Sequence, residues 1–142
     1  MPITKASSFG RVRRLNGRQK RLLLRAAGLL AIASAAVALL PFRMAVRFVS
    51  VRLGRSRAAP DEYIWAVEAV SRRLPWRTVC IEKGLVAQRM LRSSGIDAAL
   101  HYGARHHPDT GRLEAHVWVT VDGRAVMGGA EAADFAPIAV YP

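Results

Sequence analysis

Residues 74–80 read LPWRTVC and place the only cysteine of the chain, Cys80, at the start of a predicted helix. Pro75 discourages a helix from running through from upstream, and Thr78 is a suitable N-cap. Apolar side chains recur at close to helical spacing over residues 79–93. Cys80 therefore falls in the first turn, where unpaired N–H groups and a partial positive charge favour a thiolate. The alternative is that Cys80 is a small buried core residue, as free cysteines often are.

A histidine lies on a strand-like stretch further along the chain. Residues 113–122 alternate apolar and polar side chains, which is the period of a half-buried strand, and this puts His116 and Trp118 on one face. The dipeptide DG at 122–123 is a strong hairpin signal, and residues 124–127 form the predicted return strand. A histidine base beside a cysteine nucleophile is the pair that thiol acyl-transfer enzymes use. A hydrogen-bonded structural histidine is the plainer interpretation.

The other three histidines are weaker candidates for chemistry. His101 lies on a predicted strand at residues 98–104, and His106 and His107 belong to a polar loop in which we expect them to be solvated. One cysteine and scattered histidines do not have the spacing of a metal site, so we expect no metal and no cofactor. A single thiol also excludes an internal disulfide, which agrees with a reducing cytoplasm.

The positive charge is confined to the N-terminal part of the chain. Residues 1–60 contain thirteen Lys and Arg and no Asp or Glu, whereas residues 61–142 contain nine basic and ten acidic residues. The net charge of +12 is therefore an N-terminal property and not a feature of the thiol region. Because there are no interleaved aromatic residues and no recognisable DNA-binding motif, we do not expect nucleic-acid binding.

The N-terminal region has three interpretations. The apolar segment 22–42 is long enough to span a bilayer, but basic residues flank both of its ends and give no orientation bias. A signal peptide is disfavoured because Arg25 interrupts the start of the apolar run. We favour two helices, at residues 17–40 and 41–53, that pack on the thiol domain and present arginines to a partner or to anionic lipid.

The order of these elements predicts an α+β fold. A helix with the cysteine precedes a small antiparallel sheet with the histidine, which is similar to the core order of transglutaminase-like and papain-like cysteine peptidases. We expect a basic helical region at residues 1–57 and a transglutaminase-like peptidase domain at residues 58–142. The second domain is expected to begin with a helix at about residues 61–73.

Two motifs, WxxxC and AHxW, occur at a separation that makes the pair fairly specific, although either one alone is weak. They belong to a set of matching stretches: LPWRTVC at 74–80, AQRML at 87–91, SGIDA at 94–98, LHYG at 100–103, AHVWV at 115–119 and FAPIAV at 135–140. On these residues the chain resembles the lasso-peptide leader peptidases, the transglutaminase-like B proteins related to the protease that matures microcin J25. The resemblance covers residues 74–142 best and the rest of the chain more loosely.

The resemblance implies a cysteine peptidase that removes the leader of a ribosomally made precursor peptide. Carried over by motif, Cys80 is the nucleophile and His116 the general base. The implied partners are the leader of the precursor, a separate leader-binding recognition protein and an ATP-dependent lasso cyclase. The single thiol favours the cytoplasm, and the basic N-terminal helices leave peripheral membrane contact open. The alternatives are a transglutaminase-like acyltransferase that uses the same pair, and a non-catalytic basic interaction or membrane-docking module in which Cys80 is structural.

The chain departs from the family at the third member of its catalytic triad. The family has a carboxylate about a dozen residues after the histidine, but that position falls on Gly128 and Gly129 here. Asp122 is in the predicted turn, about 20 Å from His116 along an extended strand. Glu131 and Asp134 lie beyond the strand and reach the histidine only if the chain folds back. A backbone carbonyl or amide can orient a histidine as well, so the third member stays open.

Overall fold

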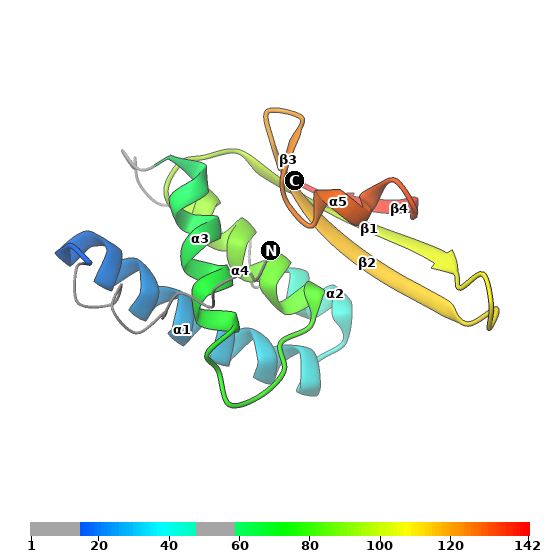
Figure 1. Cartoon of the computed structure of the whole chain (residues 1–142), viewed down its shortest axis with the longest axis horizontal. Coiled ribbons are helices and arrows are strands. Elements are labelled where there is room, and N and C mark those ends of the chain that lie inside the picture. Colours follow the sequence, from blue (N-terminus) through cyan, green and yellow to red (C-terminus); the bar gives the residue numbers. More distant parts are fainter. Residues whose placement is uncertain (1–14, 48–58) are drawn as a thin grey trace, which may run out of the picture.

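The structure is a computed structural model that describes residues 15–47 and 59–142. Four helices, α1 to α4, gather on one side of a four-stranded antiparallel sheet (Figure 1). A fifth short helix, α5, joins the last two strands. The elements are α1 (Gly17–Leu39), α2 (Phe42–Arg47), α3 (Pro60–Ser71), α4 (Cys80–Ser93), β1 (Ala98–His106), β2 (Leu113–Val121), β3 (Arg124–Met127), α5 (Gly129–Ala132) and β4 (Ala136–Tyr141). The predicted α+β fold is confirmed.

Helix α4 begins at Cys80, one residue later than expected. The N-cap is Val79 and not Thr78. A valine side chain has no acceptor, so it leaves the amides of the first turn uncapped. The main-chain N–H of Val79 itself donates to Glu82 Oε2 at 2.9 Å. This contact fixes the direction in which the chain enters α4, immediately before Cys80.

The core lies between α4 and the layers on either side of it. Helix α4 packs against α1 and α3 on one side and against β1 and β2 on the other. Its Met90 and Leu91 are fully buried, as is Leu100 on β1. Gly84 lets the sheet approach closely, because a Cβ there would lie 3.0 Å from side-chain atoms of both Leu100 and Val117. The cysteine-bearing helix is therefore held on two sides.

Helix α1 packs on α3 and α4 with a single face, formed by Leu22, Ala26, Leu30 and Ala33. Asn16 caps its start: the Gln19 N–H donates to Asn16 Oδ1 at 2.8 Å. By length and composition alone α1 is able to cross a bilayer, a test that core helices and signal sequences also pass.

The expected second helix is present as α2 from Phe42 to Arg47. The rest of its predicted length, up to residue 53, and the expected domain boundary at residues 57/58 lie outside the described residues. The helix expected at about residues 61–73 is α3, which starts with Pro60 in its first turn and ends at Ser71.

The strand order in the sheet is β3-β2-β1-β4, with every neighbouring pair antiparallel. The hairpin predicted at residues 122–123 joins β2 to β3, with Asp122 at φ 50° and Gly123 at φ 74°. These two left-handed residues match the twist of the flanking strands. Strand β1 runs two residues further than expected, to His106, because Arg105 and His106 pair with Glu114 and Leu113. Strand β4 was not predicted; it is an edge strand that contains Pro137.

Candidate active site

Cys80 and His116 line the same cleft, which has a volume of about 640 Å³. Cys80 enters it from the first helical position of α4, with its side chain partly exposed. His116 enters it from the middle of β2 and is 8% exposed. The cleft thus lies between the helices and the sheet. It is lined by both residues that the sequence predicted to be catalytic.

Two aromatic rings hold the imidazole of His116. The Trp118 ring lies nearly parallel to it, with centroids 6.1 Å apart, and the Phe135 ring lies 5.0 Å away. Gly103 on β1 makes room for both residues, since a Cβ there would come within 2.9 Å of the Trp118 ring and 3.1 Å of Phe135 Cβ. His116 and Trp118 do lie on one face of the strand, as predicted.

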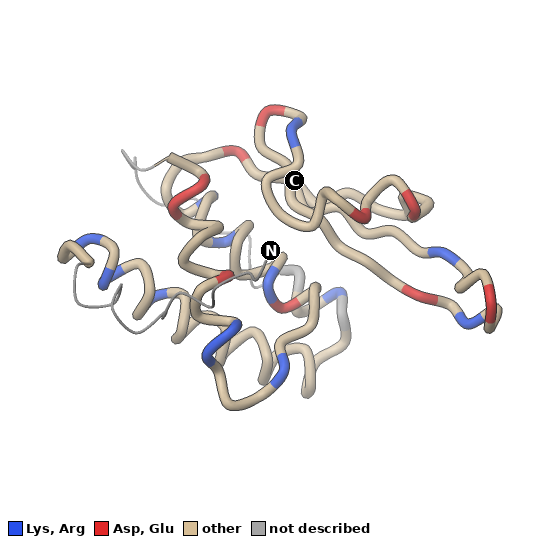
Figure 2. Tube along the Cα trace, in the orientation of Figure 1, with Lys and Arg blue, Asp and Glu red and all other residues tan. Residues whose placement is uncertain are grey.

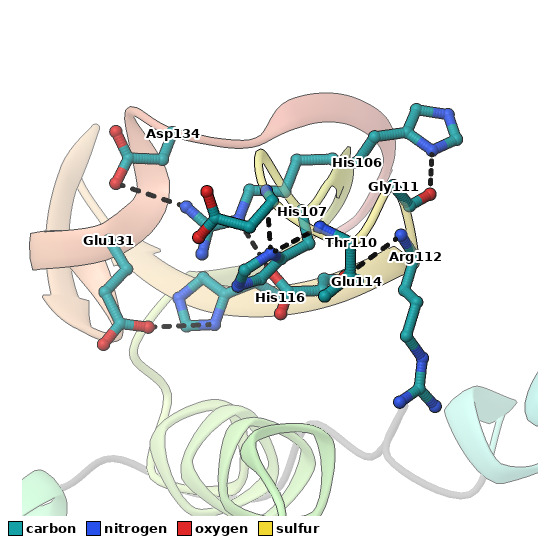
Figure 3. A network of polar contacts seen from close by, with 11 residues as sticks. His106, His107, Thr110, Gly111, Arg112, Glu114, His116, Glu131 and Asp134 are labelled. Atoms are coloured by element: carbon teal, nitrogen blue, oxygen red, sulfur yellow. Dashed lines mark hydrogen bonds and ion pairs between the residues drawn. The ribbon is translucent and has the colours of Figure 1, made fainter.

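The two ring nitrogens of His116 have different partners. Nε2 lies 2.8 Å from the main-chain oxygen of Gly128, which is hydrogen-bond distance. Nδ1 lies 3.8 Å from Glu131 Oε2, which is an ion-pair distance only if the ring is protonated. Figure 3 shows Glu131 reaching His116 from α5. The chain therefore does fold back after β3, and it brings a carbonyl and a carboxylate to the histidine.

The other candidate carboxylates do not reach the ring. Asp122 is in the β2–β3 turn, as predicted. Asp134 pairs with Arg105 at 3.6 Å. No side chain at Gly128 or Gly129 takes the family's carboxylate position, because both residues are glycine.

Charged side chains around the rim of the cleft are mostly paired. Lys83 Nζ lies 3.8 Å from Glu68 on α3, and Arg105 Nε donates to Glu114 Oε2 at 2.8 Å. That hydrogen bond is the main cause that lowers the pKa of Glu114 below its usual value, and Arg105 also adds a Coulombic attraction. The Arg105 guanidinium lies over the Phe135 ring at 4.6 Å. The charged residues at the rim of the cleft belong to no recognisable motif, so they were not predicted from the sequence.

The remaining histidines have structural surroundings. His101 stacks on Trp118 with ring centroids 5.3 Å apart and is 2.8 Å from Thr120 Oγ1. His106 Nδ1 contacts the main-chain oxygen of Gly111, and His107 Nδ1 accepts the Asp109 N–H. Within the described ranges, no three His, Cys, Asp or Glu side chains form a group able to hold a metal ion.

Trp76, the tryptophan of the WxxxC motif, contacts α1. Its Nε1–H donates to Ser34 Oγ at 3.0 Å, and it is not among the residues that line the cleft. The conspicuous WxxxC motif therefore ties the loop before α4 to the N-terminal helix, and only its cysteine belongs to the cleft.

Comparison with known protein families identifies a match for this chain. The model of the transglutaminase-like superfamily matches residues 22–140, from the first turns of α1 to the last strand. No curated protein and no solved structure shows significant similarity to the chain. The superfamily is typically one of cysteine-based enzymes and includes both cysteine peptidases and acyltransferases. Because the match covers most of the chain, including both sides of the cleft, this protein belongs to the transglutaminase-like superfamily.

Proposed function

We propose that this protein is a cysteine peptidase that removes the leader segment of a ribosomally made precursor peptide during lasso-peptide maturation. The observation that carries the proposal is the shared cleft of Cys80 and His116, with the thiol at a helix start and the imidazole held by an acceptor and two rings. The motifs at residues 74–80 and 115–119 supply the substrate class by resemblance.

The proposed reaction has two stages. The Cys80 thiol gives its proton to His116, and the thiolate attacks the carbonyl carbon of the scissile peptide bond. The carbon–nitrogen bond breaks as the imidazolium protonates the leaving amine. Water then gives a proton to His116 and attacks the thioester, which releases the leader acid and restores the thiol. The free amides of the first turn of α4 are suited to stabilise the negative oxygen of each tetrahedral intermediate.

The test is cleavage of the precursor by purified variants. Cys80→Ala and His116→Ala are each expected to lower the rate by at least roughly 10³-fold. His106→Ala is the matched control, because this histidine contacts only loop backbone among its described polar partners, and its rate is expected to stay near that of the parent. Undiminished cleavage by Cys80→Ala would overturn the proposal. Transfer of the acyl group to an added amine in preference to water would identify an acyltransferase.

We propose that leader recognition is supplied by a separate leader-binding protein and that an ATP-dependent cyclase consumes the freed amine. The chain alone is then expected to cut the full precursor slowly, and addition of the leader-binding protein is expected to raise the rate. Equal rates with and without that protein would show that recognition is part of these 142 residues.

We also propose that the protein works in the cytoplasm and rests on an anionic membrane surface through the outer face of α1. This face is opposite to the buried one and consists of exposed residues: Lys20, Arg21, Leu24, Gly28, Ala31, Ile32, Ala35, Ala38 and Leu39. Leu24 is 74% and Leu39 81% exposed. No acidic residue occurs on α1 (Figure 2), so its charge complements anionic headgroups while its apolar residues enter the interface.

A further inference from the structure

The hydrogen bond to Gly128 determines which nitrogen of His116 carries a proton. A carbonyl oxygen only accepts, so at 2.8 Å the Nε2 atom must donate its N–H to Gly128. A neutral imidazole has one N–H, and Nδ1 is then left with a lone pair. In the neutral ring Nδ1 is then the nitrogen with a lone pair available to accept a proton from Cys80 in the proposed reaction.

Glu131 does not hold the ring in this way. Its oxygen is 3.8 Å from Nδ1, too long for a hydrogen bond, and its side chain is 72% exposed. An ionised carboxylate has no proton to donate to an Nδ1 lone pair. Its favourable interaction with His116 therefore arises only when the ring is an imidazolium, and solvent screens that attraction.

We propose that the main-chain carbonyl of Gly128 is the positioning group of the Cys80–His116 pair and takes the place of a side-chain carboxylate. The inference rests on the proposed function. The carbonyl fixes the Nε2–H tautomer and the ring direction, and Trp118 and Phe135 fix the plane of the ring. Glu131 adds a solvent-screened attraction to the imidazolium but does not set the orientation of the ring.

The backbone at residues 128 and 129 leaves no space for a carboxylate side chain. Gly128 has φ 70°, and a Cβ there would lie 2.7 Å from the Val117 oxygen and 3.3 Å from His116 Nε2. A Cβ at Gly129 would lie 2.5 Å from Ala125 Cβ. The two glycines thus bring the main chain close to the ring, and this close approach is what allows a carbonyl to serve as the partner.

The direct test is the imidazole nitrogen spectrum of His116 in the Cys80→Ala protein, which does not require activity. Long-range proton–nitrogen correlations are expected to show the Nε2–H tautomer, assigned by its loss in Cys80→Ala/His116→Gln. An Nδ1–H tautomer in the neutral ring would overturn the proposal. Because this readout is independent of cleavage, it separates the positioning role from the peptidase function: loss of cleavage in Cys80→Ala alone tests only the latter.

The kinetic test compares two glycines with the same backbone strain. Gly123→Ala is the control, because Gly123 has φ 74° and nothing within 4 Å of its Cβ position. Gly128→Ala is expected to lower kcat by roughly 10²-fold, the effect of moving a catalytic group by about 1 Å, while Gly123→Ala leaves kcat near the parent value. Equal kcat values for the two variants would overturn the proposal.

Glu131→Gln separates the carbonyl from the carboxylate. We expect a loss of less than about tenfold in kcat and an unchanged Nε2–H tautomer. Loss of the orienting carboxylate of a catalytic triad costs roughly 10⁴-fold. A loss of that size in Glu131→Gln, with a changed tautomer, would assign the positioning role to Glu131 and not to Gly128.

Discussion

Helices α1 and α4 pack against each other, but they differ in how they are held. Helix α4 buries eight of its fourteen residues, between the other helices and the sheet. Helix α1 buries four of its twenty-three residues, along one face. The helix that presents the thiol is thus fixed on two sides, and the longer and more apolar helix is fixed on one. Length and apolar content do not show which helix is the centre of the fold.

The largest expected effect on stability comes from a cavity opened at a buried position of α4. Met90→Ala removes a fully buried side chain and is expected to lower the free energy of unfolding by about 2–5 kcal/mol. Met44→Ala makes the same chemical change on α2, where Met44 is 55% exposed, and is expected to cost less than about 0.5 kcal/mol. Urea denaturation of both variants measures the difference. Similar costs would show that α4 is not held more tightly than the N-terminal helices.

The parts that the sequence predicted are those set by local chemistry. The β2–β3 hairpin follows from the strict alternation of apolar and polar side chains. It also follows from a two-residue turn that requires a left-handed backbone conformation, which Asp and Gly adopt readily. Helix α4 follows from its apolar spacing. Strand β4 escaped prediction because its side chains are mostly exposed and Pro137 interrupts the strand pattern. An edge strand of this kind is defined by its pairing with β1, which is not a local property.

The candidate site likewise contains residues that the sequence predicts and contacts that only the fold shows. Cys80 and His116 were predicted because their side chains carry recognisable chemistry. The Gly128 carbonyl is a main-chain atom that every residue has, so only the fold shows that it reaches the ring. Glu131 approaches His116 because it lies on α5, a helix of a single turn that was not predicted from the sequence of residues 128–134. Pairs such as Lys83 with Glu68 join different helices and have no sequence signal.

The exposed face of α1 gives the next largest effect, in binding and not in folding. Replacing both Lys20 and Arg21 by Gln is expected to weaken binding to phosphatidylserine vesicles by about 2 kcal/mol, roughly 30-fold, at about 1 kcal/mol for each basic residue near the surface. Cosedimentation measures this change. The charge-matched control is Arg112→Gln/Arg124→Gln, which alters exposed residues beyond α1.

That control is expected to bind like the parent. Equal loss in both double variants would indicate an effect of net charge and would remove the assignment to α1. Failure of the parent to bind vesicles, together with binding of the leader-binding protein that depends on Lys20 and Arg21, would make this face a protein interface.

The smallest expected effect on stability distinguishes α1 from α4 by its sign. Each of these two helices has one internal glycine, and the surroundings of the two glycines differ. Gly28 on α1 has nothing within 4 Å of its Cβ position. Gly28→Ala is therefore expected to stabilise the protein by about 0.5–1 kcal/mol, the gain in helix propensity. Gly84 on α4 faces Leu100 and Val117 at 3.0 Å. Gly84→Ala gains the same propensity but overpacks the core by about 1–3 kcal/mol, so we expect a net loss of about 1 kcal/mol. Thermal or urea denaturation gives both signs, and stabilisation by both alanines would show that α4 and the sheet have room to separate.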